Sequence, residues 1–355
     1  MIGLPGGCLM VVLKSNKKRK AMIISREKLK ERLAALPRLQ LASLPTPLEE
    51  LKRLSAHLAG PQIWVKRDDL TGLAFGGNKI REFEYQIAQA VEQGCNVLVH
   101  SAAAQSNQSR QTAAVAAKLG MQAVIVGRSD AHAQAQGNLL LTHLFGAEVD
   151  LPAPEEQAQA VAAKMAALTA AGHHPFHTSS DARIFRSVAY VDGALELLAQ
   201  CEEQGVEPAA IYLCSGAHTH VGLVVAFKAL GVDVRVVGIS PSPRDDREAA
   251  EGHLALAREC AAILGLDLAL NAEDFESYAA FVGPDYGVVT PESCEALHLL
   301  AQQEGLLLDP SYTSKAMAGL LAHVRAGWWR SEQSLIFLHT GGTPALFAYA
   351  KDLGY

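Results

Sequence analysis

Short apolar segments alternate along this chain with helical segments of ten or more residues. In the first half, the apolar runs at 97–99 and 123–127 flank an alanine-rich stretch, 109–119, that ends at Gly120. Because parallel strands are joined by long crossover connections, usually helices, this alternation predicts βαβ units. The second half repeats the pattern, with apolar runs at 211–213, 234–239 and 335–338. We therefore expect an α/β protein with two open, twisted parallel-sheet domains and ligand-binding loops at the carboxyl ends of the strands.

The length and charge of the chain narrow its possible functions. At 355 residues it is long for a single hydrophobic core, which favours two domains. The formal net charge of −6 argues against a nucleic-acid partner, because no basic stripe offsets it. No stretch of the chain is long and apolar enough to suggest a membrane span.

The N-terminal segment has an apolar part, residues 2–13, that is followed by a basic cluster. A secretory signal carries its positive charge before the apolar part, and this part is also too short to span a bilayer. We expect residues 1–24 to be a disordered extension, with a weak membrane-surface anchor as the alternative. Further on, residues 48–58 read as a helix with Thr46 or Pro47 near its start.

The six cysteines are scattered and form no Cys-x-x-Cys pair: Cys8, Cys95, Cys201, Cys214, Cys260 and Cys294. Their spacing fits neither a zinc site nor a small disulfide framework. We therefore expect free thiols, a reducing compartment such as the cytoplasm, and no metal site.

A glycine turn precedes one lysine in the segment Gly76-Gly77-Asn78-Lys79. Paired glycines let the backbone approach a ligand, and the positive end of a helix that starts here would depress the pKa of the lysine amine. A partly deprotonated amine can condense with an aldehyde, so Lys79 is a candidate Schiff-base lysine. The alternative is an ordinary turn followed by a solvated lysine.

Two further loops join a strand to a helix and offer unpaired backbone N–H groups. Residues 101–110, SAAAQSNQSR, open a helix with Ser106, Asn107 and Gln108, which could bind a carboxylate. Residues 214–220, CSGAHTH, could hold a phosphate in the same way. An ordinary N-cap explains the first loop equally well, and a plain connection explains the second.

Tyrosines lie in two later loops, at Tyr286 and at Tyr312, and the segment 339–344, HTGGTP, follows near the end of the chain. A tyrosine can act as a general acid or base if its pKa is lowered. The alternative is a pair of half-buried packing residues.

Taken together, these segments resemble the pyridoxal-phosphate-dependent family of D-cysteine desulfhydrase and 1-aminocyclopropane-1-carboxylate (ACC) deaminase. The matching stretches are LPTPLEELKRLS, IWVKRDDLTGLAFGGNK, AAAQSNQSRQTAAVAAKLGM, YGVVTPESCEAL, GLLLDPSYTSKAMAGL and FLHTGGTPALFAY, in family order over roughly residues 38–350. The resemblance implies a tryptophan-synthase-β-like fold, that of fold type II pyridoxal-phosphate enzymes. It also implies a large domain of residues 25–83 and 191–355, a small inserted domain of residues 84–190, and a homodimer.

The resemblance assigns roles to the matching residues. It implies that Lys79 holds the cofactor and moves the α-proton, that Ser106 is catalytic, and that Asn107 bonds the cofactor phenolate oxygen. Ser106, Asn107 and Gln108 would bind the substrate carboxylate. It implies that Tyr286 and Tyr312 form an active-site tyrosine pair and that Thr313 is the partner of the pyridine nitrogen. The phosphate loop of the family corresponds to Gly216, Ala217, His218, Thr219 and His220.

Two positions favour desulfhydrase chemistry within this resemblance. Thr313 lies where ACC deaminases have glutamate, and Thr340 lies where they have leucine. A hydroxyl leaves the pyridine nitrogen neutral, which gives a weaker electron sink that suits elimination of a good leaving group. We therefore expect a lyase that converts D-cysteine or a similar small amino acid to pyruvate, ammonia and sulfide. The alternatives are ACC deaminase, a cysteate sulfo-lyase-like activity, and a cofactor-binding protein with little catalysis.

The chain also departs from the pattern of the family it resembles. That family usually reads Thr-Arg-Lys after the cofactor lysine, where this chain has Ile80-Arg81-Glu82. Glu82 thus reverses a charge that normally helps to neutralise the phosphate, and we hypothesise that His218 or His220 compensates. Residues 178–183 replace a glycine-rich segment beside the substrate pocket, and Arg183 there would suit an acidic substrate such as cysteate.

Overall fold

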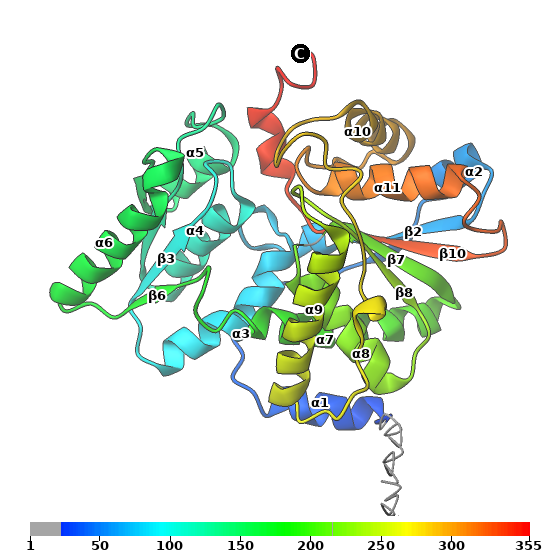
Figure 1. The fold of residues 1–355 in the computed structure, drawn as a ribbon, viewed down its shortest axis with the longest axis horizontal. Helices are drawn as coiled ribbons and strands as arrows, with labels where there is room; N and C mark the ends of the chain where they lie inside the picture. Colours follow the sequence, from blue (N-terminus) through cyan, green and yellow to red (C-terminus); the bar gives the residue numbers. More distant parts are fainter. Residues whose placement is uncertain (1–22, 215) are drawn as a thin grey trace, which may run out of the picture.

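The computed structural model describes residues 23–214 and 216–355, and its strands form two sheets (Figure 1). The larger sheet has the order β1-β2-β10-β7-β8-β9, and all of its neighbouring strands are parallel except β1 and β2. These strands are β1 (Leu48–Glu50), β2 (Gln62–Lys66), β7 (Pro208–Cys214), β8 (Arg235–Ile239), β9 (Glu276–Tyr278) and β10 (Ser334–Leu338). The predicted parallel sheets are confirmed.

Helices cover both faces of the larger sheet, because alternate side chains of its strands point to opposite sides. Ile211 and Leu213 of β7 face a core built with four helices, while Ala210 and Tyr212 face a core built with three others. The first set is α1 (Arg26–Ala34), α7 (Phe185–Gln204), α8 (His218–Leu230) and α9 (Asp246–Ile263). The second set is α2 (Lys52–Leu58), α10 (Pro291–Glu304) and α11 (Thr313–Arg325).

The smaller sheet has the order β5-β4-β3-β6 and is parallel throughout. Leu98 and Ile125 pack against α3 and α4, whereas Val99 and Val124 lie on the other face against α6. The elements are α3 (Asn78–Glu92), β3 (Val97–Ser101), α4 (Asn107–Leu119), β4 (Gln122–Val126), α5 (Gly137–Leu144), β5 (Glu148–Asp150), α6 (Gln157–Ala170) and β6 (Pro175–His177).

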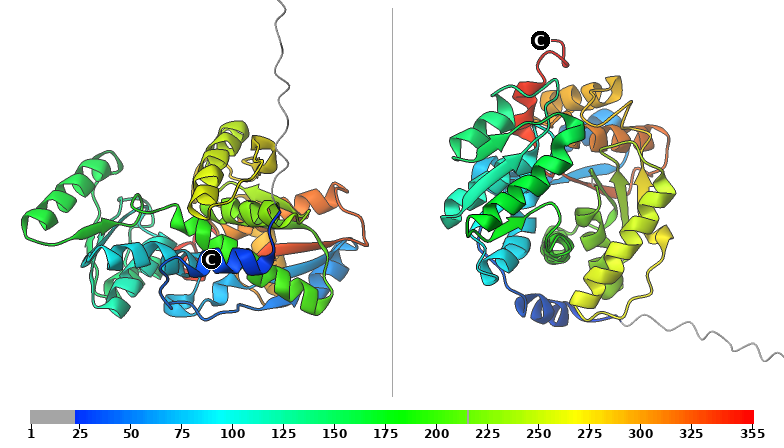
Figure 2. Two further views of the ribbon diagram at one scale, coloured as in Figure 1. Left: turned by 90° about the horizontal axis from the view of Figure 1, so that it is seen from below. Right: turned by 60° about the vertical axis from the view of Figure 1, so that its left-hand side comes forward.

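The two sheets lie side by side, with α6 at one end of the molecule and the paired strands β2 and β10 at the other (Figures 1 and 2). Helix α3 connects them, since its Ile80 and Phe83 belong to the core of the smaller sheet and its Tyr85 to that of the larger one. The strands of the smaller sheet fall within residues 97–177. The division into domains at residues 84 and 190 stays a prediction.

The helix expected over residues 48–58 is wrong in its first half. Leu48–Glu50 forms an antiparallel pair with β2, and the helix begins only at Lys52. Leucines at 48, 51, 54 and 58 suit one face of a helix, but pairing with the edge of the larger sheet outweighs this local preference.

The expected N-terminal extension, residues 1–24, lies outside the described residues except for Ile23 and Ile24. The Ile24 N–H donates to the carbonyl of Ala229 at the end of α8 (2.9 Å). Among the described helices, none combines the length and apolar character that crossing a membrane requires. In the same part of the chain, no three His, Cys, Asp or Glu side chains gather as metal ligands would.

Candidate active site

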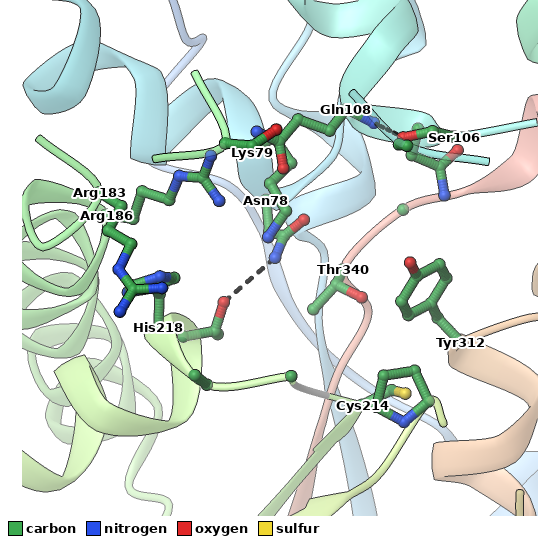
Figure 3. Close-up of a pocket in the computed structure, with 18 of the residues that line it drawn as sticks. Asn78, Lys79, Ser106, Gln108, Arg183, Arg186, Cys214, His218, Tyr312 and Thr340 are labelled. Atoms are coloured by element: carbon green, nitrogen blue, oxygen red, sulfur yellow. Dashed lines mark hydrogen bonds between the residues drawn. The ribbon is translucent and has the colours of Figure 1, made fainter. Parts of the chain in front are cut away.

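A cavity of about 420 Å³ lies where the carboxyl ends of strands from both sheets meet (Figure 3). His100 and Ser101 line it from the end of β3, and Cys214 lines it from the end of β7. The first residues of α3, α4 and α8 complete the wall, together with Tyr312 and the loop at Thr340. A cleft at the carboxyl edge of parallel strands is the usual ligand site of such folds.

Lys79 reaches this cavity from the first turn of α3, and the turn before it requires glycine. Gly76 and Gly77 have φ angles of 62° and 118°. A Cβ on Gly76 would lie 2.1 Å from the carbonyl oxygen of Asp69, and one on Gly77 would lie 2.6 Å from Nε2 of Gln111. Only glycine therefore lets the chain enter α3 at this angle and direct Lys79 into the cavity.

The Lys79 amine is enclosed and paired with a carboxylate. Its Nζ donates to Oε1 of Glu82 (2.8 Å), and only 25% of its side chain is exposed. Burial lowers the pKa of Lys79; Glu82 opposes this shift, and the positive charge of Arg186 adds to it. The result is an amine with a larger unprotonated fraction than a surface lysine, which is what attack on an aldehyde needs.

The start of α4 presents three polar side chains to the cavity, those of Ser106, Asn107 and Gln108. Ser106 Oγ accepts the backbone N–H groups of Gln108 and Ser109 (3.2 and 3.3 Å), so it is the N-cap of α4 and its own proton remains available. Gln108 Nε2 is buried without a hydrogen-bond partner in the described chain. These donors suit a carboxylate.

Asn107 is oriented by a residue that the sequence did not indicate. Its Oδ1 accepts a hydrogen bond from Asn138 Nδ2 (2.8 Å), which leaves the amide N–H₂ of Asn107 free to face the cavity. Asn138 is fully buried in α5 and also donates to the backbone carbonyl of Gln105 (2.9 Å). Its sequence position, far from the recognisable motifs, gave no signal of this role.

The start of α8 forms the opposite wall of the cavity, with Gly216, Ala217, His218 and Thr219. No side chain in the described part caps this helix, so its first N–H groups are available to an anion. Thr219 Oγ1 accepts from Asn78 Nδ2 (3.1 Å) and donates to Oε1 of Glu82 (3.1 Å). The carboxylate of Glu82 thus contacts the end of the cavity that the start of α8 forms.

Neither histidine of this loop is a suitable cation. His218 Nδ1 interacts with Ser187 Oγ (3.0 Å), and burial together with the charge of Arg186 lowers the pKa of His218 well below its ordinary value, so the ring is neutral. His220 does not line the cavity; its ring lies against His253 and Phe275, with centroids 5.1 and 5.9 Å away. The His220 side chain therefore lies outside the cavity that the candidate phosphate loop borders.

The two tyrosines form a pair, because their hydroxyl oxygens lie 2.9 Å apart. Tyr312 lines the cavity. Tyr286 lies behind Tyr312 and lines a second cavity. Burial raises the pKa of both phenols. They therefore remain protonated at neutral pH and are suited to donate a proton rather than to remove one.

Thr313 is fully buried behind Tyr312 and is not among the cavity-lining residues. Its hydroxyl donates to Asp309 Oδ1 (2.7 Å) and accepts the Asp309 N–H (2.8 Å). Burial raises the pKa of Asp309. The threonine thus connects a buried carboxyl group to the start of α11.

Two arginines line the cavity, and the sequence had indicated only Arg183. Arg183 and Arg186 both line it, together with His100 and Ser179, and none of the described lining residues is Asp or Glu (Figure 3). The recurrence of arginine three residues apart at the start of α7 was the only available sequence signal for Arg186.

The chain is similar in sequence to known proteins. Residues 39–341 match the family of pyridoxal-phosphate dependent enzymes. The D-cysteine desulfhydrases of Salmonella typhi and Salmonella newport (strain SL254) are each 39% identical over 327 residues, which is 89% of this chain and 97% of theirs.

Two solved structures resemble the fold. An ACC deaminase homologue superposes with a TM-score of 0.83 at 30% identity, covering 93% of this chain and 99% of its own. A threonine deaminase from T.th. has a TM-score of 0.63 at 21% identity, covering 90% and 98% respectively, which shows a shared fold.

Proposed function

Because this chain belongs to the pyridoxal-phosphate-dependent enzymes of fold type II, in the family of D-cysteine desulfhydrase and ACC deaminase, we propose that it is a carbon–sulfur lyase acting on D-cysteine. Its cofactor is pyridoxal 5'-phosphate. The observation that carries the proposal is an enclosed lysine in a cavity with two anion-binding helix starts, those of α4 and α8.

The residues present fit this cofactor. Lys79 offers an amine of lowered pKa, and the uncapped start of α8 offers N–H groups for a phosphate. A Cβ on Gly216, at that start, would meet no atom within 4 Å, so the loop leaves room there. When bound, the cofactor supplies an electron sink for the negative charge that develops at the substrate Cα.

In the proposed reaction, Ser106, Asn107 and Gln108 bind the substrate carboxylate. Lys79 Nζ removes the proton from Cα, and the bond from Cβ to sulfur breaks as the C–H electron pair forms the Cα=Cβ double bond. Tyr312, supported by Tyr286, donates a proton to the departing thiolate. The released enamine takes up water and gives pyruvate and ammonia, so sulfide, pyruvate and ammonia form in equal amounts.

D-Cysteine is proposed as the substrate because the relatives named above are D-cysteine desulfhydrases and because Thr340, which lines the cavity, stands where ACC deaminases have leucine. The test is keto-acid and sulfide release from D- and L-cysteine, β-chloroalanine, cysteate, serine and ACC. We expect equimolar sulfide and pyruvate from D-cysteine. Release of 2-oxobutyrate from ACC with none of these products would favour ACC deaminase instead. Cofactor binding without turnover in the whole panel would identify a binding protein.

One observation favours cysteate as a second candidate. The Arg183 side chain lines the cavity and makes no hydrogen bond or ion pair to the residues that the structure describes. A free guanidinium in a cavity without lining carboxylates would suit an anionic sulfonate leaving group. Sulfite and pyruvate from cysteate, and their loss in Arg183→Gln, would support this alternative.

We also propose a cytoplasmic homodimer. Leu140 and Leu144 of α5 and Phe347, in a segment that contacts α5, are exposed apolar side chains that could cover one another in a dimer. Among the described residues, the five cysteines are unpaired, which fits a reducing compartment. Light scattering after gel filtration and cell fractionation test the two points.

A further inference from the structure

Glu82 presents a charge problem at the phosphate end of the cavity. Its carboxylate is fully buried, and Oε1 accepts from Lys79 Nζ and from Thr219 Oγ1 at the start of α8. The other oxygen, Oε2, has no hydrogen-bond partner in the described chain. A phosphate dianion bound here would be repelled by Glu82 unless another positive group lies close by. His218 is neutral, so it does not supply that charge.

Besides Lys79, whose amine is needed for the cofactor aldehyde, Arg186 is the cation paired with Glu82 in the described chain. The Nε of Arg186 is 3.9 Å from Glu82 Oε2, and the other oxygen of the same carboxylate, Oε1, accepts the hydrogen bond from Thr219. Arg186 and Thr219 therefore lie on either side of one carboxylate group. Its neighbour Ser187 contacts the ring of His218, which brings the first turn of α7 against the first turn of α8. Figure 3 shows the guanidinium directed toward His218.

The Arg186 side chain is held from behind and has one free end. Nε donates to Gln86 Oε1 (2.8 Å), and Nη2 donates to the Thr178 carbonyl oxygen. The residue is only 7% exposed, yet it lines the cavity, and Nη1 has no acceptor among the residues that the structure describes. A buried cation that is fixed in direction and keeps unused donors is prepared for an anion.

We propose that Arg186 binds the phosphate of the cofactor through Nη1 and that Glu82 is the counter-ion that holds Arg186 and Lys79 in place. The inference rests on the cofactor-binding part of the proposed function. The cation at this site thus comes from α7, while α3 contributes a carboxylate. Arg183 lines the same cavity, but no residue in the described part of the chain fixes its side chain, and so it remains available to the substrate.

The test compares two ligands that differ only in the phosphate. Apoenzyme of wild type and of Arg186→Gln is titrated with pyridoxal phosphate and, separately, with pyridoxal, and binding is read from absorbance. Because a hydrogen bond to a charged group is lost, we expect the Kd for pyridoxal phosphate to rise about 10–100-fold. The Kd for pyridoxal should change less than about threefold. Equal losses for both ligands, or no loss for either, would overturn the proposal.

Arg183→Gln is the matched control, since it removes the same charge from the same cavity. We expect its preference for pyridoxal phosphate over pyridoxal to stay near that of wild type. A loss as large as that in Arg186→Gln would show that only the general positive potential matters, and would overturn the assignment to Arg186.

A further variant and the melting temperature of each apoenzyme distinguish a loss of phosphate binding from a loss of folded structure. Should Arg186→Gln fail to fold, Arg186→Lys decides, because it keeps the charge but loses the planar fork. We expect its phosphate preference to fall at least about threefold, and an unchanged preference would overturn the proposal. Wild-type apoenzyme that binds neither ligand would refute the proposed function itself. A wild-type preference that survives Arg186→Gln would refute only the role of Arg186.

Discussion

Three of the polar side chains that line the cavity around Lys79 are fixed by other protein groups. Ser106 accepts from the backbone of its own helix, Asn107 is held by Asn138, and Arg186 is held by Gln86. Such support fixes the direction of the donors before any ligand binds, which reduces the cost of ordering them on binding.

Asn138 offers a test of this support at a residue outside the cavity. In Asn138→Ala the Asn107 amide loses its anchor, so we expect the affinity for pyridoxal phosphate to fall about fivefold, as for one lost hydrogen bond. Asn107→Ala should lose at least as much. Titration of the double variant checks the link: a loss no greater than that of Asn107→Ala alone is expected, whereas additive losses would contradict it.

Sequence reasoning indicated the cavity-lining residues that stand in recognisable loops and missed those that reach the cavity from elsewhere. Lys79 follows a glycine turn, and Ser106 opens a helix, so local patterns indicated both. Asn138 and Arg186 belong to other crossover connections and meet the site only through tertiary contacts. Glu82 was recognised as a departure, but its counter-ion could not be chosen without the packing of α7 against α8.

At the scale of elements, the turn before α3 determines where Lys79 points. Gly341 packs on it from the loop after β10, since a Cβ there would lie 2.7 Å from Cα of Gly77. Two backbone segments from distant parts of the chain therefore meet without side chains between them. The helices after β3 and β7 are present, as the strand–helix alternation predicted, and they begin at Asn107 and His218, whereas β1 required knowledge of its partner strand.

Gly77→Ala tests this turn. A Cβ there would meet Gln111 at 2.6 Å and the Thr340 carbonyl oxygen at 3.2 Å, and the φ of 118° disfavours alanine. We expect at least about tenfold weaker cofactor binding and a lower melting temperature. Gly94→Ala, two residues after the other end of α3, is the control, because its φ is also positive but a Cβ there meets nothing within 4 Å. Similar effects of the two variants would refute the special role of the turn.

For the whole molecule, two doubly covered sheets provide rigid walls, and the cavity lies between them. The sequence predicted this architecture because buried parallel strands are apolar on both faces and their crossovers are helical. It could not predict the buried histidines of the larger unit, whose burial depends on how α8, α9 and α11 pack. His220, His253 and His323 are at most 6% exposed.

These three histidines predict a steep acid sensitivity. Burial lowers the pKa of His220 well below its ordinary value and those of His253 and His323 to about 4. The unfolded chain, with histidine pKa values of about 6.5, then binds protons that the folded chain does not. The contribution of these neutral rings to the free energy of unfolding is complete above about pH 6.5 and is lost as the pH falls from there toward 4.

Urea unfolding between pH 7 and pH 5 measures this loss. Near pH 5 we expect these three rings to lower the free energy of unfolding by up to about 4 kcal/mol per pH unit, from about three extra protons on the unfolded chain. Burial also lowers the pKa values of His100 and His218, which adds to the loss in the same direction. A free energy of unfolding that stays constant over this range would show that these rings are protonated in the folded protein.

The central claim is that Lys79 alone carries the cofactor, although Lys66 and Lys315 are also enclosed. Lys66 Nζ is occupied by the Thr46 carbonyl oxygen, Glu196 and Gln200, and Lys315 Nζ by the carbonyl oxygen of Val282. The most direct measurement is borohydride reduction of the holoenzyme followed by peptide mass spectrometry. We predict a single pyridoxyl-phosphate adduct, on Lys79. An adduct on Lys66, on Lys315 or on no lysine would contradict the account.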